Sequence, residues 1–283
     1  MSRIAYVNGA YVPHDDAAVS IDDRGYQFGD GVYEVVFLIN GHMADEQMHL
    51  DRLERSLGEM AMSLPISRAA LQMIMARVIR MNGVKTGLVY VQITRGVARR
   101  DHKWTKPLRP SVIVTAKNTA SDVPKEVKAV NVITVPDERW ERRDIKTIQL
   151  LPNCLAKQKA YEAGAYEAIL IEKDGTITEG SSSNVWIVTN DNEIITRPAT
   201  EKILNGITRR AVAKVAETLQ MSVIERPFDK DELLAAKEAF VTSASSHVTA
   251  IGHVDGQKIA GGIAGPVANR LRKAYIDTVV GDA

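Results

Sequence analysis

The alternation of apolar and polar residues in the N-terminal part of the chain predicts a strand-rich unit that begins with hairpins. Apolar residues at 4–7 and 11–13 flank Asn8-Gly9, a dipeptide typical of a two-residue hairpin turn. A second apolar run, 32–39, ends at Asn40-Gly41 and is predicted to form the arm of the next hairpin.

Two helices and two more strands are predicted before residue 118. Leu50, Leu53 and Leu57 recur at helical spacing, so a helix is expected at 49–62. Ser67 is a candidate N-cap for a second helix, whose apolar stripe ends before Gly83. Strands are expected at 88–94 and 111–117, and the basic segment between them, 95–110, is expected to be irregular.

A small polar stretch at 119–124 has no periodicity and is expected to link two domains. Beyond it the pattern alternates between strand and helix without a regular βαβ rhythm. The predicted strands are 127–135, 166–171, 176–178, 185–188 and 238–242, and the predicted helices are 152–164, 208–220, 231–237 and 266–280. This mixture favours two α+β domains, a smaller one at 1–118 and a larger one at 125–283.

Composition narrows the classes of protein that remain. The chain has 283 residues, 45% hydrophobic and 25% charged, which is typical of a folded protein with a real core. The net charge of +1 favours no nucleic-acid partner. The single cysteine, Cys154, excludes an intrachain disulfide and a Cys-rich metal site. The N-terminus has no signal-like apolar region, and no apolar run is long enough to span a membrane, so we expect a cytoplasmic protein.

Common catalytic fingerprints are absent from the sequence, which has no GxxxxGK[ST], HExxH or GxSxG motif and only six scattered histidines. Two other segments are candidates for chemistry. In EGSSSN, Glu179 precedes serines with free hydroxyls, although such clusters usually mark a solvated turn. In NGITRR, Gly206 precedes Thr208 at a helix start that can bind phosphate through backbone N–H groups, although a plain surface helix also explains it.

Two further segments carry charged groups. If the segment around Lys146 is extended, Lys146 shares a face with Asp144 and Ile148, and apolar neighbours can make a lysine a nucleophile or base. A snorkelling surface lysine is the alternative. Arg100 and His102 alternate and can point the same way to bind a carboxylate, unless they belong to an ordinary basic loop.

Together with DRGYQFGDGVYE (23–34) and HLDRL (49–53), these four segments resemble the D-amino acid aminotransferases. These are fold-type IV pyridoxal phosphate enzymes, related to branched-chain aminotransferases and aminodeoxychorismate lyases. The resemblance runs from the first hairpin to the helix after Pro266. It implies a two-domain α+β architecture with a barrel-like sheet in the C-terminal domain. It also implies a homodimer whose sites lie near the subunit interface.

The resemblance implies roles for particular residues. Lys146 matches the Schiff-base lysine that also carries the proton during transamination, and Glu179 matches the carboxylate on the pyridine nitrogen. The remaining cofactor residues implied are Arg52, Ile207, Thr208, Ser243 and Ala244 around the phosphate, and Leu204 against the ring. Tyr33, Arg100 and His102 match the trap for the substrate α-carboxylate, and in the family the other subunit typically supplies the loop with the last two.

The resemblance implies D-amino acid transamination by a ping-pong mechanism, with D-alanine and 2-oxoglutarate as type substrates. Two positions depart from the family pattern: Ala244 often is threonine there, and Arg99 adds a cation beside the trap. Arg99 either competes for the carboxylate or favours dicarboxylates. The alternatives are an aminodeoxychorismate lyase, an amine or branched-chain L-amino acid aminotransferase, and a non-catalytic binding protein on the same scaffold.

Overall fold

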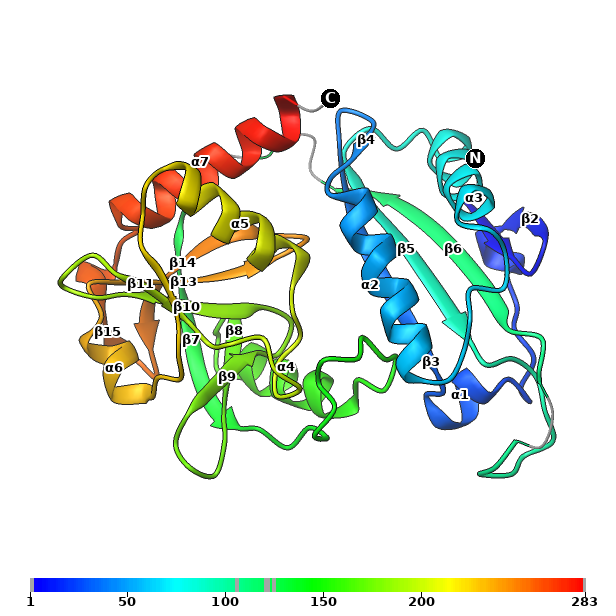
Figure 1. The fold of residues 1–283 in the computed structure, drawn as a ribbon, viewed down its shortest axis with the longest axis horizontal. Coiled ribbons are helices and arrows are strands. Elements are labelled where there is room, and N and C mark those ends of the chain that lie inside the picture. Colours follow the sequence, from blue (N-terminus) through cyan, green and yellow to red (C-terminus); the bar gives the residue numbers. More distant parts are fainter. Residues whose placement is uncertain (1–2, 105–106, 120–122, 124–125, 282–283) are drawn as a thin grey trace. The chain divides into compact units, whose positions relative to one another are not determined.

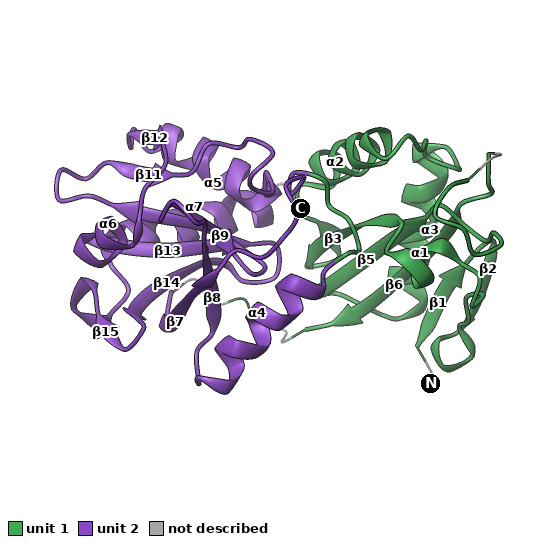
Figure 2. Ribbon diagram, turned by 90° about the horizontal axis from the view of Figure 1, so that it is seen from below, with its two compact units in different colours: residues 1–123, 145–149, 283 green, residues 124–144, 150–282 purple. Residues whose placement is uncertain are grey.

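A computed structural model describes residues 3–104, 107–119, 123 and 126–281 of the chain. Two compact units make up the protein (Figure 2). Unit 1 contains residues 1–123 and Ile145–Gln149, and unit 2 contains Pro124–Asp144 and Leu150–Asp282. The predicted domains, 1–118 and 125–283, stay predictions, and positions 120–122 and 124 of the expected linker lie outside the described residues.

Unit 1 is built on a six-stranded antiparallel sheet (Figure 1). Across the sheet the strands are β2 (Ala10–Pro13), β1 (Ile4–Val7), β6 (Ser111–Asn118), β5 (Gly87–Thr94), β3 (Gly31–Ile39) and β4 (His42–Met43). Both predicted hairpins are confirmed. The Asn and the Gly of each turn have positive φ; in the first turn φ is 49° at Asn8 and 108° at Gly9. Asn and Gly adopt positive φ more readily than other residues, which is why they favour such turns.

Two long helices, α2 (Glu46–Glu59) and α3 (Arg68–Met81), pack on this sheet. Their buried leucines and valines join the inward side chains of β3, β5 and β6 in one apolar core. Ser67 caps α3 as predicted, accepting a hydrogen bond from Ala70 N at 3.2 Å. The prediction of 49–62 for α2 is displaced by three residues at each end, because the helix begins at Glu46, directly after Asp45, and ends at Glu59, shortly before Ala61. Asp45 and Ala61 both have positive φ, which a helix cannot continue through.

A short helix, α1 (Arg24–Phe28), was not predicted, because five residues are too few to show a helical period. Asp23 caps its start by accepting a hydrogen bond from Gly25 N at 2.8 Å. Gly29 ends it in the left-handed region with a φ of 68°. A 3-10 turn, η1 (His14–Asp16), follows β2.

Unit 2 is built on a nine-stranded mixed sheet. Across the sheet the strands are β12 (Val223–Glu225), β11 (Ile194–Thr196), β10 (Asn184–Val188), β13 (Glu238–Ser243), β14 (His247–Val254), β7 (Ala129–Pro136), β8 (Glu167–Ile171) and β9 (Ile177–Gly180), with β15 (Gln257–Lys258) beside β14. Three neighbouring pairs, β11/β12, β14/β7 and β7/β8, are parallel. Strand β9 at the end of the sheet also contacts β10, so the sheet curls back on itself, as expected of a barrel-like domain.

Four helices cover this sheet: α4 (Leu151–Glu162), α5 (Ile207–Thr218), α6 (Lys230–Ala235) and α7 (Pro266–Gly281). Helices α5 and α7 pack against each other and on β13, while α4 packs on β7 and β8. A 3-10 turn, η2 (Ala260–Gly262), precedes α7. Each predicted strand and helix of this part is present with ends displaced by at most two residues, and the α+β class is confirmed.

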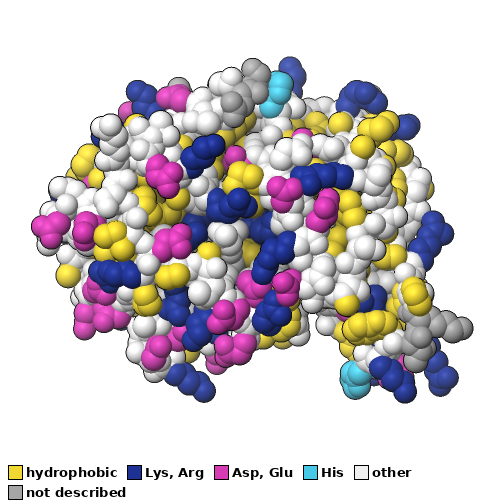
Figure 3. Space-filling view, viewed as in Figure 1, with side chains coloured by type: hydrophobic (Ala, Val, Ile, Leu, Met, Phe, Trp, Pro, Cys, Tyr) yellow, Lys and Arg dark blue, Asp and Glu magenta, His cyan; other side chains and the backbone are white. Residues whose placement is uncertain are grey.

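The strands that the pattern missed are β11, β12, β14 and β15. Three of them are only two or three residues long. Strand β14 is buried along most of its length, so it lacks the apolar–polar alternation of a half-exposed strand. In the ranges that the structure describes, every helix is too short or too polar to span a bilayer. On the face drawn in Figure 3, basic and acidic side chains are interspersed, in line with the small net charge.

Candidate active site

Strand β3 presents Tyr33 and Glu34 to opposite faces of the unit 1 sheet, because side chains alternate along a strand. Tyr33 stacks on Tyr90 of β5, with ring centroids 5.7 Å apart. Burial, and then the neighbouring Tyr33, raise the pKa of Tyr90 to about 12. The amino group of Lys146 lies 4.2 Å from the centroid of the Tyr33 ring. The structure thus brings together two of the predicted site residues, Tyr33 and Lys146.

The segment that carries Lys146 runs beside the start of β3, away from the residues that pair with β4. Tyr33 N donates to Lys146 O at 3.0 Å, and Thr147 forms an isolated bridge with Val32. The rest of the segment is irregular, so the strand alternation that would align Lys146 with Asp144 and Ile148 does not apply. Lys146 is half-buried between buried neighbours, so its position is set by the fold, unlike that of a freely snorkelling surface lysine.

Glu34 forms a buried charged cluster with helix α2. Arg52 donates to both of its carboxylate oxygens, through Nε at 2.7 Å and Nη2 at 2.8 Å. His49 Nδ1 lies 2.7 Å from Glu34 Oε2. Although burial alone would raise it, the pKa of Glu34 is lowered to about 2 by Arg52 and His49. Arg52, the arginine expected on the phosphate, is therefore oriented through its ion pair with Glu34.

Arg100 and His102 occupy an exposed loop after β5. The guanidinium of Arg100 lies 5.3 Å from the centroid of the Phe28 ring, and the His102 ring lies 5.7 Å from it. The two side chains share one aromatic neighbour, as the prediction that they point the same way requires. Among the described residues, neither side chain makes a hydrogen bond or ring contact with Tyr33, and Arg99 is exposed beside them.

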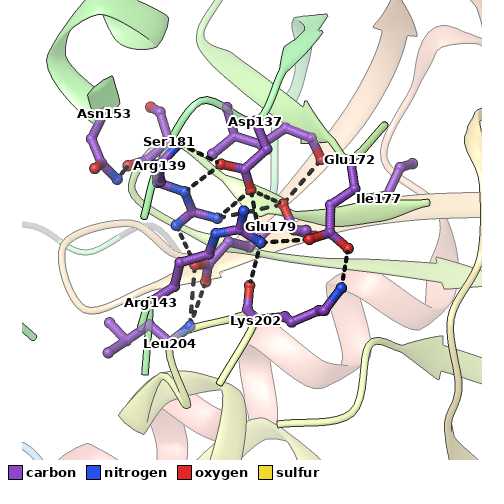
Figure 4. Close-up of polar contacts among 12 residues, drawn as sticks. Asp137, Arg139, Arg143, Asn153, Glu172, Ile177, Glu179, Ser181, Lys202 and Leu204 are labelled. Atoms are coloured by element: carbon purple, nitrogen blue, oxygen red, sulfur yellow. Dashed lines mark hydrogen bonds and ion pairs between the residues drawn. The ribbon is translucent and has the colours of Figure 1, made fainter. Parts of the chain in front are cut away.

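In unit 2, the carboxylate of Glu179 is buried at the end of β9 (Figure 4). Leu204 N lies 3.1 Å from each of its oxygens, and Asn184 Nδ2 donates to Oε2 at 3.0 Å. Arg139 Nη1 donates to Oε1 at 2.5 Å. Burial raises the pKa of Glu179, and Arg139 acts against that rise. The site therefore holds a carboxylate that a further cation would stabilise.

Arg139 is itself shared between two carboxylates. Its Nε and Nη2 donate to Asp137 at 3.0 and 2.8 Å, while Nη1 reaches Glu179. Burial acts to raise the pKa of Asp137, but the hydrogen bonds and charge of Arg139, together with Thr178 and Arg143, lower it. Arg143 extends the alternation of charges, with Nη1 3.5 Å from Asp137 and 2.8 Å from Glu172 (Figure 4).

Asn184 connects Glu179 to the start of helix α5. Besides Glu179, its Nδ2 donates to Leu204 O at 2.8 Å. Its Oδ1 lies where a Cβ at Gly206 would be, so only glycine fits at the N-cap. In the described chain no side chain caps this helix, so the N–H groups around Ile207 and Thr208 can meet an anion.

The serines of EGSSSN do not have the free hydroxyls that the sequence suggested. The hydroxyls of Ser181, Ser182 and Ser183 all donate to the buried carboxylate of Glu167. The segment that follows Glu179 is therefore a loop held in place by hydrogen bonds to Glu167. Ser243 Oγ lies 2.7 Å from Ser246 Oγ in the turn that contains Ala244.

Sequence reasoning missed Glu34, Arg139 and Asp137. A signal existed for Glu34, because a glutamate within the apolar run GVYEVVFLI needs a partner when it is buried. For Arg139 the sequence offered only a mixed-charge segment, PDERWERRD, and nothing in it pointed to Glu179.

Comparisons with known proteins show the family to which the chain belongs. A family model described as amino-transferase class IV matches residues 31–254. The D-alanine aminotransferase of Bacillus licheniformis is 40% identical over 97% of this chain and 96% of its own length. That of Listeria monocytogenes serotype 4b (strain F2365) is 39% identical over 97% and 95%.

Solved structures agree on the fold. The T.th. branched-chain amino acid aminotransferase with pyridoxamine 5'-phosphate has a TM-score of 0.91 and 26% identity, covering 100% of this chain and 96% of that one. The Escherichia coli branched-chain enzyme, at 23% identity and a TM-score of 0.89 over 100% and 96%, shares the fold. The chain belongs to the class IV aminotransferases, which are enzymes that use pyridoxal phosphate.

Proposed function

We propose that this enzyme transfers the amino group of a D-amino acid, with D-alanine as the type substrate, to a 2-oxo acid such as 2-oxoglutarate. The observation that carries the proposal is the pair Arg100 and His102 on one aromatic ring, in a chain about 40% identical to D-alanine aminotransferases. An arginine and a histidine side by side suit a carboxylate.

We propose that Lys146, Glu179, Arg52 and the start of α5 hold the cofactor. The residues fit it: Glu179 is a buried carboxylate that a protonated ring nitrogen would stabilise, and α5 begins with N–H groups suited to phosphate. Leu204, Ser243 and Ala244 complete the proposed set. Pyridoxal phosphate supplies an electron-accepting ring and an aldehyde carbon that receives the amino group.

Each of these residues has its own proposed role in the reaction. Lys146 Nζ would hold the cofactor at its aldehyde carbon and, as a free amine, would take the Cα proton of the substrate. The same amine would carry that proton across to the cofactor, so that one base would serve both ends of the proton transfer. Glu179 would pair with the protonated ring nitrogen, and that cation, like Arg139, would oppose the rise of its pKa. Tyr33, Arg100 and His102 hold the α-carboxylate, so that the Cα–H of a D-amino acid points at Lys146.

Assembly and location are part of this proposal. We propose a homodimer, with the exposed Arg100 loop of one subunit serving the site of the other, in the cytoplasm. Sedimentation velocity tests the dimer. Mixing an Arg100→Ala variant with a Lys146→Ala variant tests the sharing, because heterodimers regain one intact site in this arrangement.

The experiment that tests the activity is the visible spectrum of the purified enzyme before and after D-alanine, with L-alanine in parallel. Loss of the cofactor band with D-alanine alone supports the proposal. The fold likeness to branched-chain aminotransferases makes L-leucine the second substrate to test. Loss of the cofactor band with L-leucine alone would mean that the enzyme acts as a branched-chain aminotransferase. It would also contradict the role proposed for Arg100 and His102.

A further inference from the structure

Arg24 of helix α1 binds the backbone of the loop that carries Arg100 and His102. Arg24, which is only 3% exposed, donates through Nη1 to Asp101 O at 2.6 Å and through Nη2 to His102 O at 3.0 Å. The two carbonyls belong to adjacent residues of the loop. A guanidinium is a rigid planar fork, so this contact fixes the direction of the backbone between Arg100 and His102.

The same helix supports the two side chains. Phe28 contacts both, with Arg100 and His102 at 5.3 and 5.7 Å from its ring centroid, and Arg24 lies 4.8 Å from that ring. A cation near an aromatic face is attracted to it, and the contact also limits the rotamers of a long exposed arginine. Phe28 thus supports the side chains of both Arg100 and His102.

Arg24 is in turn held by buried charges and by the stem of the loop. Asp30 accepts from Arg24 Nε at 2.8 Å and from Arg95 Nε at 2.8 Å. The backbone N–H of Arg24 donates to Gly96 O at 2.9 Å. Arg24 is therefore anchored in the interior of unit 1 rather than on its exposed surface.

We infer that Arg24 and Phe28 are positioning residues for substrate recognition, which hold Arg100 and His102 ready for the substrate carboxylate. This inference rests on the proposed function. Two exposed side chains lose conformational freedom when they bind a ligand, and holding them beforehand reduces that loss. Arg24 and Phe28 act through the loop and do not themselves touch the carboxylate.

The test is a double-mutant cycle in steady-state transamination. Arg24→Lys keeps the charge beside Asp30, but one ammonium group cannot replace the fork across two carbonyls. We expect KM for D-alanine and for 2-oxoglutarate to rise about tenfold, which is the size of one lost charged hydrogen bond, with kcat and the cofactor spectrum unchanged. Phe28→Leu should shift KM in the same direction. Arg77→Met is the matched control, because Arg77 also lies over an aromatic ring, Tyr11, at 4.3 Å.

The decisive step repeats Arg24→Lys in the Arg100→Ala/His102→Ala background. If Arg24 acts through those residues, the tenfold effect disappears there. An equal rise in KM in both backgrounds, or an unchanged KM in the first, overturns the inference. Amide hydrogen exchange at 97–104 should also become faster in cofactor-free Arg24→Lys and Phe28→Leu. Protection equal to that of the wild type would contradict the inference that Arg24 and Phe28 hold the loop. A wild-type enzyme inactive on D-alanine would instead refute the proposed function, and the same cycle then runs on whichever substrate it accepts.

Discussion

Arg139 and Glu179 form a buried ion pair, with Nη1 of the arginine 2.5 Å from Oε1 of the glutamate. Burial favours the neutral form of the carboxyl and raises its pKa, and Arg139 opposes that rise. Asp137 on the other side of the guanidinium pushes the pKa of Glu179 upward again. The charge of the Glu179 carboxylate therefore depends on a residue 40 positions away in the sequence.

Replacing Arg139 should weaken that charge. In Arg139→Met the pKa of Glu179 should rise further, because the cation that opposes the effect of burial is gone, so the acid limb of the kcat/KM profile should move to higher pH. Measuring the profile between about pH 5 and pH 9 checks this expectation. Arg142→Met is the matched control, because Arg142 pairs with Asp144 at 3.0 Å instead. A lower kcat with the limb in its original place would mean that Arg139 serves the structure alone.

Lys146→Ala should remove both covalent attachment of the cofactor and the base. We expect the visible cofactor band to be lost and transamination to fall by at least about 100-fold, the contribution of general acid–base catalysis. Lys237→Ala, whose Nζ donates to Asn192 on the surface, is the control. Near-normal turnover would exclude Lys146 as the base.

Arg100→Ala should act mainly on substrate binding. Loss of one charged hydrogen bond corresponds to about 1.5–3 kcal/mol, so KM for D-alanine and 2-oxoglutarate should rise by about one to two orders of magnitude. Kinetics with both substrates measure the effect. If KM is unchanged, the carboxylate ligand lies elsewhere, and Arg99→Ala becomes the variant to measure.

Gly206→Ala should weaken cofactor binding without a backbone penalty. The φ of Gly206 is −59°, which alanine adopts easily, but the added Cβ would overlap with Asn184 Oδ1. Asn184 would have to move, and its hydrogen bonds to Glu179 and Leu204 would loosen. We expect the dissociation constant of pyridoxal phosphate to rise about tenfold. Gly58→Ala, where a Cβ meets open space, should leave it unchanged.

The cluster of Glu34 predicts a pH dependence of stability. Its pKa in the fold, about 2, lies below the ordinary value of 4.5, so its stabilisation is complete above pH 4.5 and is lost as the pH falls toward 2. The loss should be about 3 kcal/mol in the free energy of unfolding. Urea unfolding at several pH values measures it. Glu34→Gln should flatten this dependence and destabilise the protein at pH 7, whereas the exposed Glu54→Gln should do neither.

Much of the local structure was predictable from the sequence, because its determinants lie within a few residues of one another. Asn8-Gly9 favours a turn and Ser67 caps the helix beside it, whatever the rest of the chain does. The class of enzyme was also predictable, since the motifs around Lys146 and Glu179 resemble a family that the comparisons then showed.

Only the tertiary structure decided which partners surround those motifs. Arg139 reaches Glu179, Arg52 reaches Glu34, and Arg24 reaches the carbonyls of residues 101 and 102, over separations of 18 to 78 positions. Such contacts follow from strand order and helix packing, which no local pattern specifies. The sequence by itself determined the motifs that indicate the family, and the fold determined the charge and orientation of their side chains, because burial and long-range ion pairs exist only once the chain has folded.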